Sequence, residues 1–198
     1  MRGGVLGDLV KGQVCLFAGL SVCLVIMPGC LSFNCGMSDF GVHWGTAVPY
    51  AFGFLGAALF TRRGLRAAAP LLPAPRFVRV AGDSFALLLV GILLTPYTLA
   101  DAVHWVHRSF GAALFLYEMV LAVRLLAWGF GGLLSVVVQV VGGVTSGVSV
   151  VLAEGPLVVG QAVFQLAFGV TIIRMARLLP RQGPEPGETS TGQSFSVN

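Results

Sequence analysis

The stretch that decides the fold is DAVHWVHRSFGAALFLYEMVLAVR, residues 101–124. It opens with an acid and two histidines, becomes almost wholly apolar, and carries one further acid, Glu118, before Arg124. At about 3.6 residues per turn, one face of a helix carries His104, His107, Gly111, Phe115, Glu118 and Ala122. The remaining surface is apolar and suits lipid. The pattern predicts a membrane helix whose polar stripe, including Glu118, faces the interior of a bundle.

Composition places the whole chain in the same class. Of its 198 residues, 56% are hydrophobic and only 10% are charged, and the mean hydropathy is +0.89. A soluble domain usually has about a quarter of its residues charged. Apolar runs near the ~20 residues that cross a bilayer recur along the chain. We therefore expect an all-α polytopic bundle embedded in the lipid bilayer.

The apolar runs predict six transmembrane helices. Their approximate bounds are 12–33, 42–61, 80–100, 101–124, 133–153 and 156–179. The first run lacks a small-x-small cleavage site, so we expect a retained helix rather than a secretory signal. Residues 1–179 then form one membrane domain, and the polar residues 180–198 form a disordered tail.

The distribution of basic residues predicts the orientation. If six helices cross the membrane, eleven of the twelve basic residues lie on the side of the termini, and only Arg108 lies opposite. Five of the eleven are in the segment 62–79, expected to be a loop. Basic loops face the cytoplasm. We expect both termini to be cytoplasmic, in the cell membrane. The arginines at helix ends set topology, so no nucleic-acid partner is expected.

Two cysteines frame the loop after the first helix. Cys30 and Cys35 lie on the side opposite the arginines in this orientation. In an oxidising compartment they would form a disulfide. The alternative is a pair of free, half-buried thiols, and the sequence leaves both open.

Asp101, His104 and His107 are the most ligand-like cluster. Positions i, i+3 and i+6 of a helix spread over about 240°, so one ion cannot reach all three without distortion. His104 and His107 would need a third ligand, such as His43 or Asp39. The alternative is a set of histidines that only form hydrogen bonds at the outer interface. Without a complete ligand set or a catalytic motif, we assign no metal, cofactor or catalytic residue.

Glu118 falls in the cytoplasmic half of the membrane, about 21 Å along the helix from His104. A carboxylate there is costly, and is usually paired, neutral or functional. Its candidate partners elsewhere in the chain are Asp83, Gln139, Gln161 and Gln165. One interpretation is a buried acid that links helices, and the other is a proton- or substrate-linked role.

The helix expected at 133–153 carries Gly143 and Gly147. This small-xxx-small spacing allows two helices to approach closely. It indicates contact within the bundle, or association with another membrane protein or a second copy of this chain.

Two segments carry a family resemblance, MSDFGVHWG (37–45) and VGILLTPYTLADAVHWVHRSFGAALFLYEM (90–119). They resemble the DRAM and FRAG-type six-helix membrane proteins and related bacterial membrane proteins of unknown function. In that group an acidic or glycine-containing loop precedes the second helix and a histidine opens the fourth. Ser38, Asp39, Gly41 and His104 would occupy these places. The resemblance covers the first four helices and implies a bundle linked to membrane lipids or regulation, without established catalysis.

Three functions are consistent with these patterns. The first is an accessory, regulatory or lipid-associated bundle without catalysis, which the small size and the missing catalytic motifs favour. The second is a small proton-coupled transporter that uses Glu118. The third is a membrane enzyme with a metal at His104 and His107.

Overall fold

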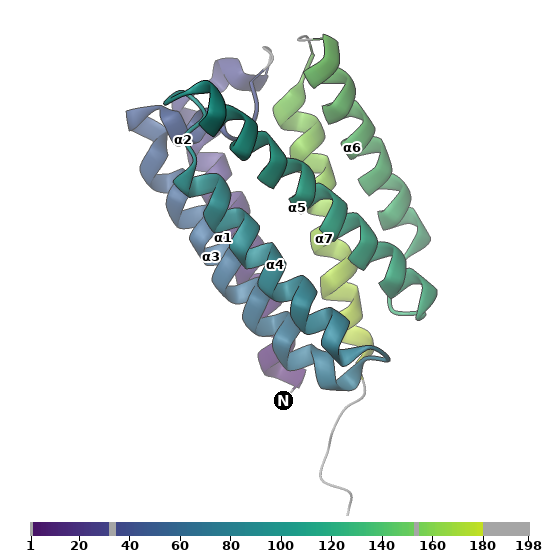
Figure 1. Cartoon of the computed structure of the whole chain (residues 1–198). Coiled ribbons are helices and arrows are strands. Elements are labelled where there is room, and N and C mark those ends of the chain that lie inside the picture. Colours follow the sequence, from purple (N-terminus) through teal and green to yellow (C-terminus); the bar gives the residue numbers. More distant parts are fainter. Residues whose placement is uncertain (1, 32–34, 153–154, 180–198) are drawn as a thin grey trace, which may run out of the picture.

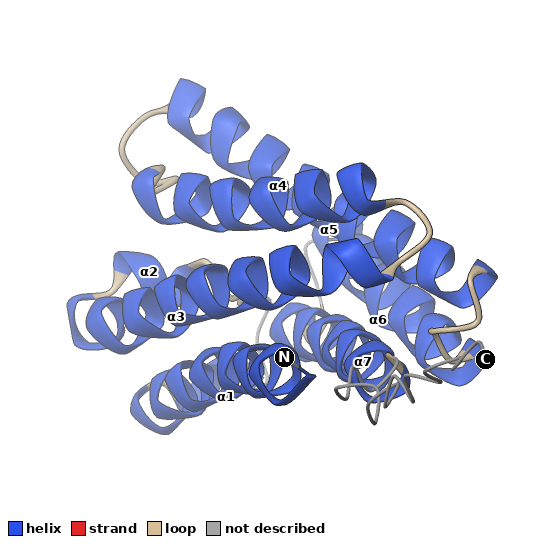
Figure 2. Cartoon of the chain, turned by 90° about the horizontal axis from the view of Figure 1, so that it is seen from below, coloured by secondary structure: helices blue, strands red, loops and turns tan. Residues whose placement is uncertain are grey.

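The computed structural model describes residues 2–31, 35–152 and 155–179, and the regular structure in these ranges is helical (Figures 1 and 2). This confirms the all-α class. The long helices are α1 (Arg2–Ile26), α3 (Trp44–Ala68), α4 (Pro75–Leu94), α5 (Asp101–Ala127), α6 (Leu133–Leu152) and α7 (Leu157–Leu178). The short ones are η1 (Pro28–Leu31), α2 (Asp39–Val42) and η2 (Ala69–Leu71). The predicted tail, 180–198, lies outside the described residues.

Five helices of the described chain are long and apolar enough to cross a membrane. They are α1 from Gly3 onward, α4, α5, α6 and α7. This agrees with a membrane-integral protein. The helix α3 is as long as α1, with 25 residues in each, but its composition is less apolar. Six spans were predicted, and the structure supports five of them.

Helix ends differ from the predicted bounds mainly on the arginine-rich side. The segment 62–79, predicted as a loop, is largely helical, because α3 continues to Ala68 and α4 begins at Pro75. Alanine, leucine and arginine are strong helix formers, so the first real interruption is Pro70. Proline at the first turn of α4 costs no hydrogen bond, since that N–H has no helical partner.

The other ends also follow from proline. The helix α1 ends at Ile26, earlier than the predicted 33, because Pro28 follows. The helix α4 ends at Leu94, not at 100, because Pro96 restricts the residue before it. These two early ends lengthen the connections on the side opposite the arginines, where the cavity described below has its polar end.

The long helices form a ring. The helix α1 packs on α3, α3 on α4, and α4 on α5. The helix α7 packs against α6 and against α1, and α5 touches both α6 and α7, which closes the ring (Figures 1 and 2). Buried apolar side chains from α1, α3, α4, α5 and α7 form one continuous core.

The contact between α1 and α3 brings two backbones together. A Cβ atom added to Gly19 would lie 2.6 Å from the carbonyl oxygen of Pro49 and 2.9 Å from the Cα of Gly53. At Gly53, an added Cβ would lie 3.1 Å from the carbonyl oxygen of Cys15. Such glycine contacts let dispersion forces act over a close helix–helix interface inside a membrane.

The helices α6 and α7 also meet through small residues, and of the predicted pair Gly143 takes part, since its added Cβ would lie 3.3 Å from Phe164 Cδ2. A Cβ on Gly142 would lie 2.6 Å from the backbone nitrogen of Phe164, and one on Gly160 would lie 2.7 Å from Ser146 Oγ. Gly147 has open space at its Cβ position. The closest contact is therefore made by Gly142 and Ser146, beside the predicted glycine pair. Association of α6 with another protein stays a prediction.

We predict that Gly19→Ala lowers the free energy of unfolding in detergent by about 1–3 kcal/mol, because the new methyl group overlaps backbone atoms. Thermal denaturation of the purified protein measures the loss. Gly4→Ala is the control, since its Cβ position is open and alanine favours helix. Equal stability of both variants would contradict the close backbone contact.

Candidate functional site

The ring of helices surrounds a partly open cavity of about 790 Å³. All six long helices contribute to its wall, together with residues 36–39 and Tyr97. Most of the wall is apolar, with aromatic side chains from three helices: Tyr50 and Phe54 on α3, Phe85 on α4 and Phe115 on α5. The polar lining gathers at the end formed by residues 36–39, Tyr97 and the start of α5.

A disulfide holds the chain next to this polar end. Cys30 and Cys35 are bonded, with their Cα atoms 5.0 Å apart, which is the disulfide alternative of the two that the sequence left open. Directly after Cys35, the backbone N–H of Gly36 donates to Asp39 Oδ2 at 2.6 Å. The N–H of Met37 donates to Gln161 Oε1 on α7 at 2.7 Å. The segment 36–39 is thus held by an internal hydrogen bond, by the bond to α7 and by the disulfide that precedes it.

Tyr97 closes the same end from the connection between α4 and α5. Its hydroxyl donates a hydrogen bond to Asp39. Partial burial and this bond to a carboxylate raise the pKa of Tyr97 well above its usual value. The phenol therefore stays protonated and keeps donating at any physiological pH.

His107 joins three parts of the chain. Its Nδ1 lies 2.8 Å from the carbonyl oxygen of Thr95, and its Nε2 lies 2.8 Å from Ser38 Oγ. Because a carbonyl only accepts, Nδ1 carries a proton, and a neutral ring accepts the Ser38 hydroxyl at Nε2. The histidine is 9% exposed. It acts here as a structural link between the segment 36–39, the end of α4 and α5.

The four residues predicted as an outer polar cluster do not come together. His104 lines the cavity and packs its ring against Tyr97, with ring centroids 5.9 Å apart. Asp101 and His43 are exposed, and both nitrogens of His107 are occupied. In the part of the chain that the structure describes, no three His, Cys, Asp or Glu side chains lie close enough to hold a metal ion. The metal-enzyme alternative therefore lacks a ligand set.

Arg108 is the basic group at the cavity. It lines the polar end, and its guanidinium lies 5.9 Å from the ring centroid of the exposed Trp105. The ion pairs of the described residues involve Arg62, Arg63 and Arg66 and leave Arg108 without a carboxylate partner. Arg108 is exposed, and the polar end therefore carries one cation and one carboxylate, Asp39, which form no ion pair with each other among the described residues.

Glu118 lies in the interior, as its position on the helix predicted. It is 1% exposed. Of the predicted partners, Gln165 is the one that binds it: Nε2 of Gln165 lies 3.0 and 2.9 Å from the two carboxylate oxygens. Gln165 also lines the cavity, and its own Oε1 is buried without a partner. Gln161 instead holds Met37.

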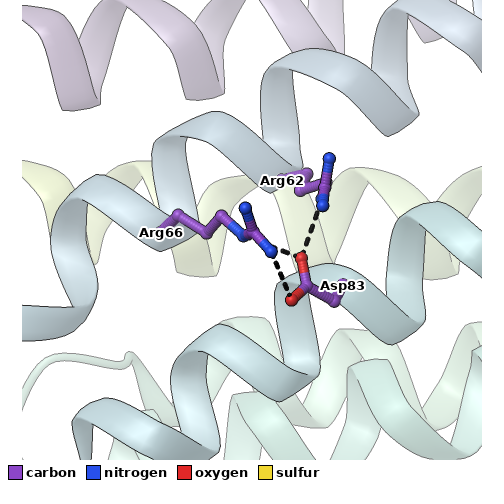
Figure 3. Close-up of polar contacts among 3 residues, drawn as sticks. All are labelled: Arg62, Arg66 and Asp83. Carbon is purple, nitrogen blue, oxygen red and sulfur yellow. Dashed lines mark hydrogen bonds and ion pairs between the residues drawn. The ribbon is translucent and has the colours of Figure 1, made fainter.

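Asp83 was predicted as a partner of Glu118, and this is wrong. Its carboxylate pairs with two arginines of α3: Arg62 Nε at 2.7 Å, and Arg66 through Nε and Nη2 at 2.8 Å each (Figure 3). The Asp83 side chain is 40% exposed. The predicted α3–α4 loop is helical, which brings these arginines alongside Asp83 and leaves Glu118 with an amide alone.

Sequence reasoning missed two participants in the site, Tyr97 and Thr95. Neither carries a local signal, because both lie in a proline-containing connection whose path depends on where α4 ends. Two other amides, Gln13 and Gln139, are buried without a hydrogen-bond partner among the described residues. Gln13 packs on Gly169, where an added Cβ would lie 2.4 Å from its Oε1.

Comparison with protein-family models, curated proteins and solved structures finds no match for this chain. The resemblance of segments 37–45 and 90–119 to the DRAM and FRAG-type proteins therefore stays a prediction.

We predict different effects of two substitutions at Glu118. Glu118→Gln keeps a side-chain acceptor for Gln165 and adds a donor for its unpaired Oε1, so stability in detergent should stay close to wild type. Glu118→Leu strands the buried amide of Gln165 and should lower the free energy of unfolding by about 1–3 kcal/mol. Thermal unfolding gives both values.

Tyr117→Leu is the matched control, because Tyr117 is the next residue and is 39% exposed. If Glu118→Leu and Tyr117→Leu were equally stable, the Glu118–Gln165 hydrogen bond would have no structural importance.

Proposed function

We propose that this is a membrane protein without catalysis that binds one anionic lipid in its central cavity. The observation that carries the proposal is a largely apolar cavity whose polar end carries Arg108, an exposed cation with no ion pair among the described residues. The Asp39 carboxylate at the same end already accepts hydrogen bonds from Gly36 and Tyr97. A lipid phosphate at Arg108 would bind the guanidinium through charge-assisted hydrogen bonds.

The size and lining of the cavity support an amphipathic ligand. Its volume of about 790 Å³ is within the ~300–1,000 Å³ range of small-molecule sites. Apolar walls beside a small polar end match an acyl chain attached to a polar head group. Gly111 on α5 and Gly147 on α6 both line the cavity, and an added Cβ at either would meet no atom within 4 Å. Open space therefore lies against two helices of the wall.

The threading that goes with this function has six spans, both termini cytoplasmic, in the plasma membrane. We propose α3 as the sixth span, because it runs along α1 through contacts from Gly12–Thr61 to Gly19–Gly53. The Arg62–Asp83–Arg66 cluster then lies toward the cytoplasm, as basic residues prefer. Arg108 and the Cys30–Cys35 disulfide lie toward the outside, an oxidising side.

A second candidate is a proton-coupled carrier. It is supported by the burial of Glu118 beside Gln165, which lines the cavity. Buried acids of this kind are frequent in proton-linked membrane transport.

The lipid proposal predicts a preference for phosphatidylglycerol over phosphatidylcholine. Native mass spectrometry of the detergent-purified protein, titrated with each lipid, measures binding. Arg108→Gln should weaken phosphatidylglycerol binding about tenfold, because one charge-assisted contact is lost. Gly147→Leu should weaken both lipids, because the new side chain fills the cavity.

Gly4→Leu is the matched control for Gly147→Leu, since its Cβ position is also open but lies outside the cavity wall. Equal binding of the two lipids, or unchanged binding in Gly147→Leu, would count against a lipid site in the cavity.

The threading predicts the outcome of reporter fusions. Fusions after Leu72 and after Leu179 should report a cytoplasmic location, and one after Ser38 should report an external location, because basic connections stay inside. A cytoplasmic signal at all three positions would contradict six spans.

A further inference from the structure

In the pair of Glu118 and Gln165, one buried atom, the side-chain carbonyl oxygen of Gln165, lacks a hydrogen bond. Nε2 of Gln165 serves both carboxylate oxygens, while Oε1 of Gln165 is buried with no partner. Both side chains are at least nine-tenths buried, at 1% and 6% exposure. A carboxylate only accepts hydrogen bonds, so it has nothing to offer an unpaired carbonyl oxygen.

One proton satisfies every group in the pair. When the Glu118 carboxylate takes a proton from water, the new O–H donates to Gln165 Oε1. The N–H of Gln165 donates at the same time to the other carboxyl oxygen. A small rotation of the amide brings the two groups face to face. The neutral acid–amide pair then has two hydrogen bonds, and no net charge is buried among apolar side chains.

The described parts of α4, α5, α6 and α7 place no cation in contact with Glu118 that would stabilise its ionised form. The helix α6 carries no charged residue. Asp83 on α4 is paired with Arg62 and Arg66, and Arg124 on α5 is exposed. The other titratable or charged residues of α4, α5 and α7 are Arg76, Arg79, Asp101, His104, His107, Arg108, Tyr117, Arg174 and Arg177. In the described structure Glu118 has a hydrogen bond only to Gln165.

We propose that Glu118 is a proton-binding site at the inner end of the cavity, and that the anionic ligand of the cavity binds together with uptake of this proton. The inference rests on the proposed lipid-binding function. Gln165 is the connection, because its side chain both lines the cavity and bonds Glu118. An anion in the cavity is repelled by an ionised, negatively charged Glu118, whereas a protonated, neutral Glu118 does not repel it.

The expected size of this coupling follows from the helix geometry. Arg108 and Glu118 are ten residues apart, so a phosphate at Arg108 lies about 15 Å along the axis from the carboxylate. At an effective dielectric constant of about 20, ionising Glu118 weakens binding of a singly charged anion roughly sixfold. Affinity is therefore highest at low pH and falls as the pH rises and Glu118 loses its proton.

Isothermal titration calorimetry of the detergent-purified full chain with short-chain phosphatidylglycerol tests the coupling. The phosphodiester keeps one negative charge across the pH series, so the ligand itself does not titrate. Two buffers of different ionisation enthalpy give the proton uptake directly. We expect fractional proton uptake and a roughly sixfold fall in affinity from low to high pH. Glu118→Gln should bind at every pH as the wild type does at low pH.

His104→Gln is the control at another side chain that lines the cavity. This variant should keep the part of the pH dependence that Glu118→Gln removes. If Glu118→Gln keeps the full pH dependence and proton uptake, the coupling is wrong although the lipid still binds. If phosphatidylglycerol binds at no pH, the proposed function fails and the coupling fails with it.

The proton itself is tested without any ligand. Infrared spectra of the wild type at low pH should show the carbonyl stretch of a protonated carboxylic acid that Glu118→Gln lacks and Glu118→Asp shifts. Loss of that band on raising the pH should track the fall in lipid affinity. Absence of a Glu118-dependent band at every pH would overturn the proton-binding site.

Discussion

Hydrocarbon offers no hydrogen-bond partner to a polar side chain, and this constraint orders the interior of the bundle. Two buried polar groups beside the cavity, Glu118 and His107, find their partners on other elements rather than on their own helix. Gln165 on α7 reaches Glu118 on α5, and His107 reaches both Ser38 and the carbonyl oxygen of Thr95. Because these bonds join elements far apart in the sequence, they fix the ring of helices around a space that apolar packing alone would tend to fill.

The polar stripe of α5 could be predicted from the sequence because helical periodicity depends only on local geometry. Glu118 and His107 are buried and His104 lines the cavity. The disulfide of Cys30 is formed, whereas the sequence left it open beside free thiols. The partner of Glu118 was predicted only as one of four, since all four candidates lie on other helices whose rotation depends on packing across the bundle.

The predictions that were wrong concern segments where two local sequence preferences conflict. Arginine density indicated a loop at 62–79, yet arginine is also a good helix former, and the chain stays helical until Pro70 stops it. The extension of α3 places Arg66 beside Asp83. This ion pair could not be predicted from the sequence around Asp83, because it depends on where α3 ends. Likewise His104 and His107 share a helix turn, but their partners come from the connections before α3 and α5, whose paths have no periodic signal.

Some glycines of this chain lie at close helix–helix contacts, and others face the cavity. Substitutions at the two sets would have different consequences. Gly19 and Gly53 sit where the backbones of α1 and α3 touch, so a lineage that replaced either would have to separate the two helices. Gly111 and Gly147 face open space in the cavity, and larger residues there would leave the bundle intact. Divergence at the second pair would thus change what the cavity admits while the fold persists, and one scaffold would serve several ligands.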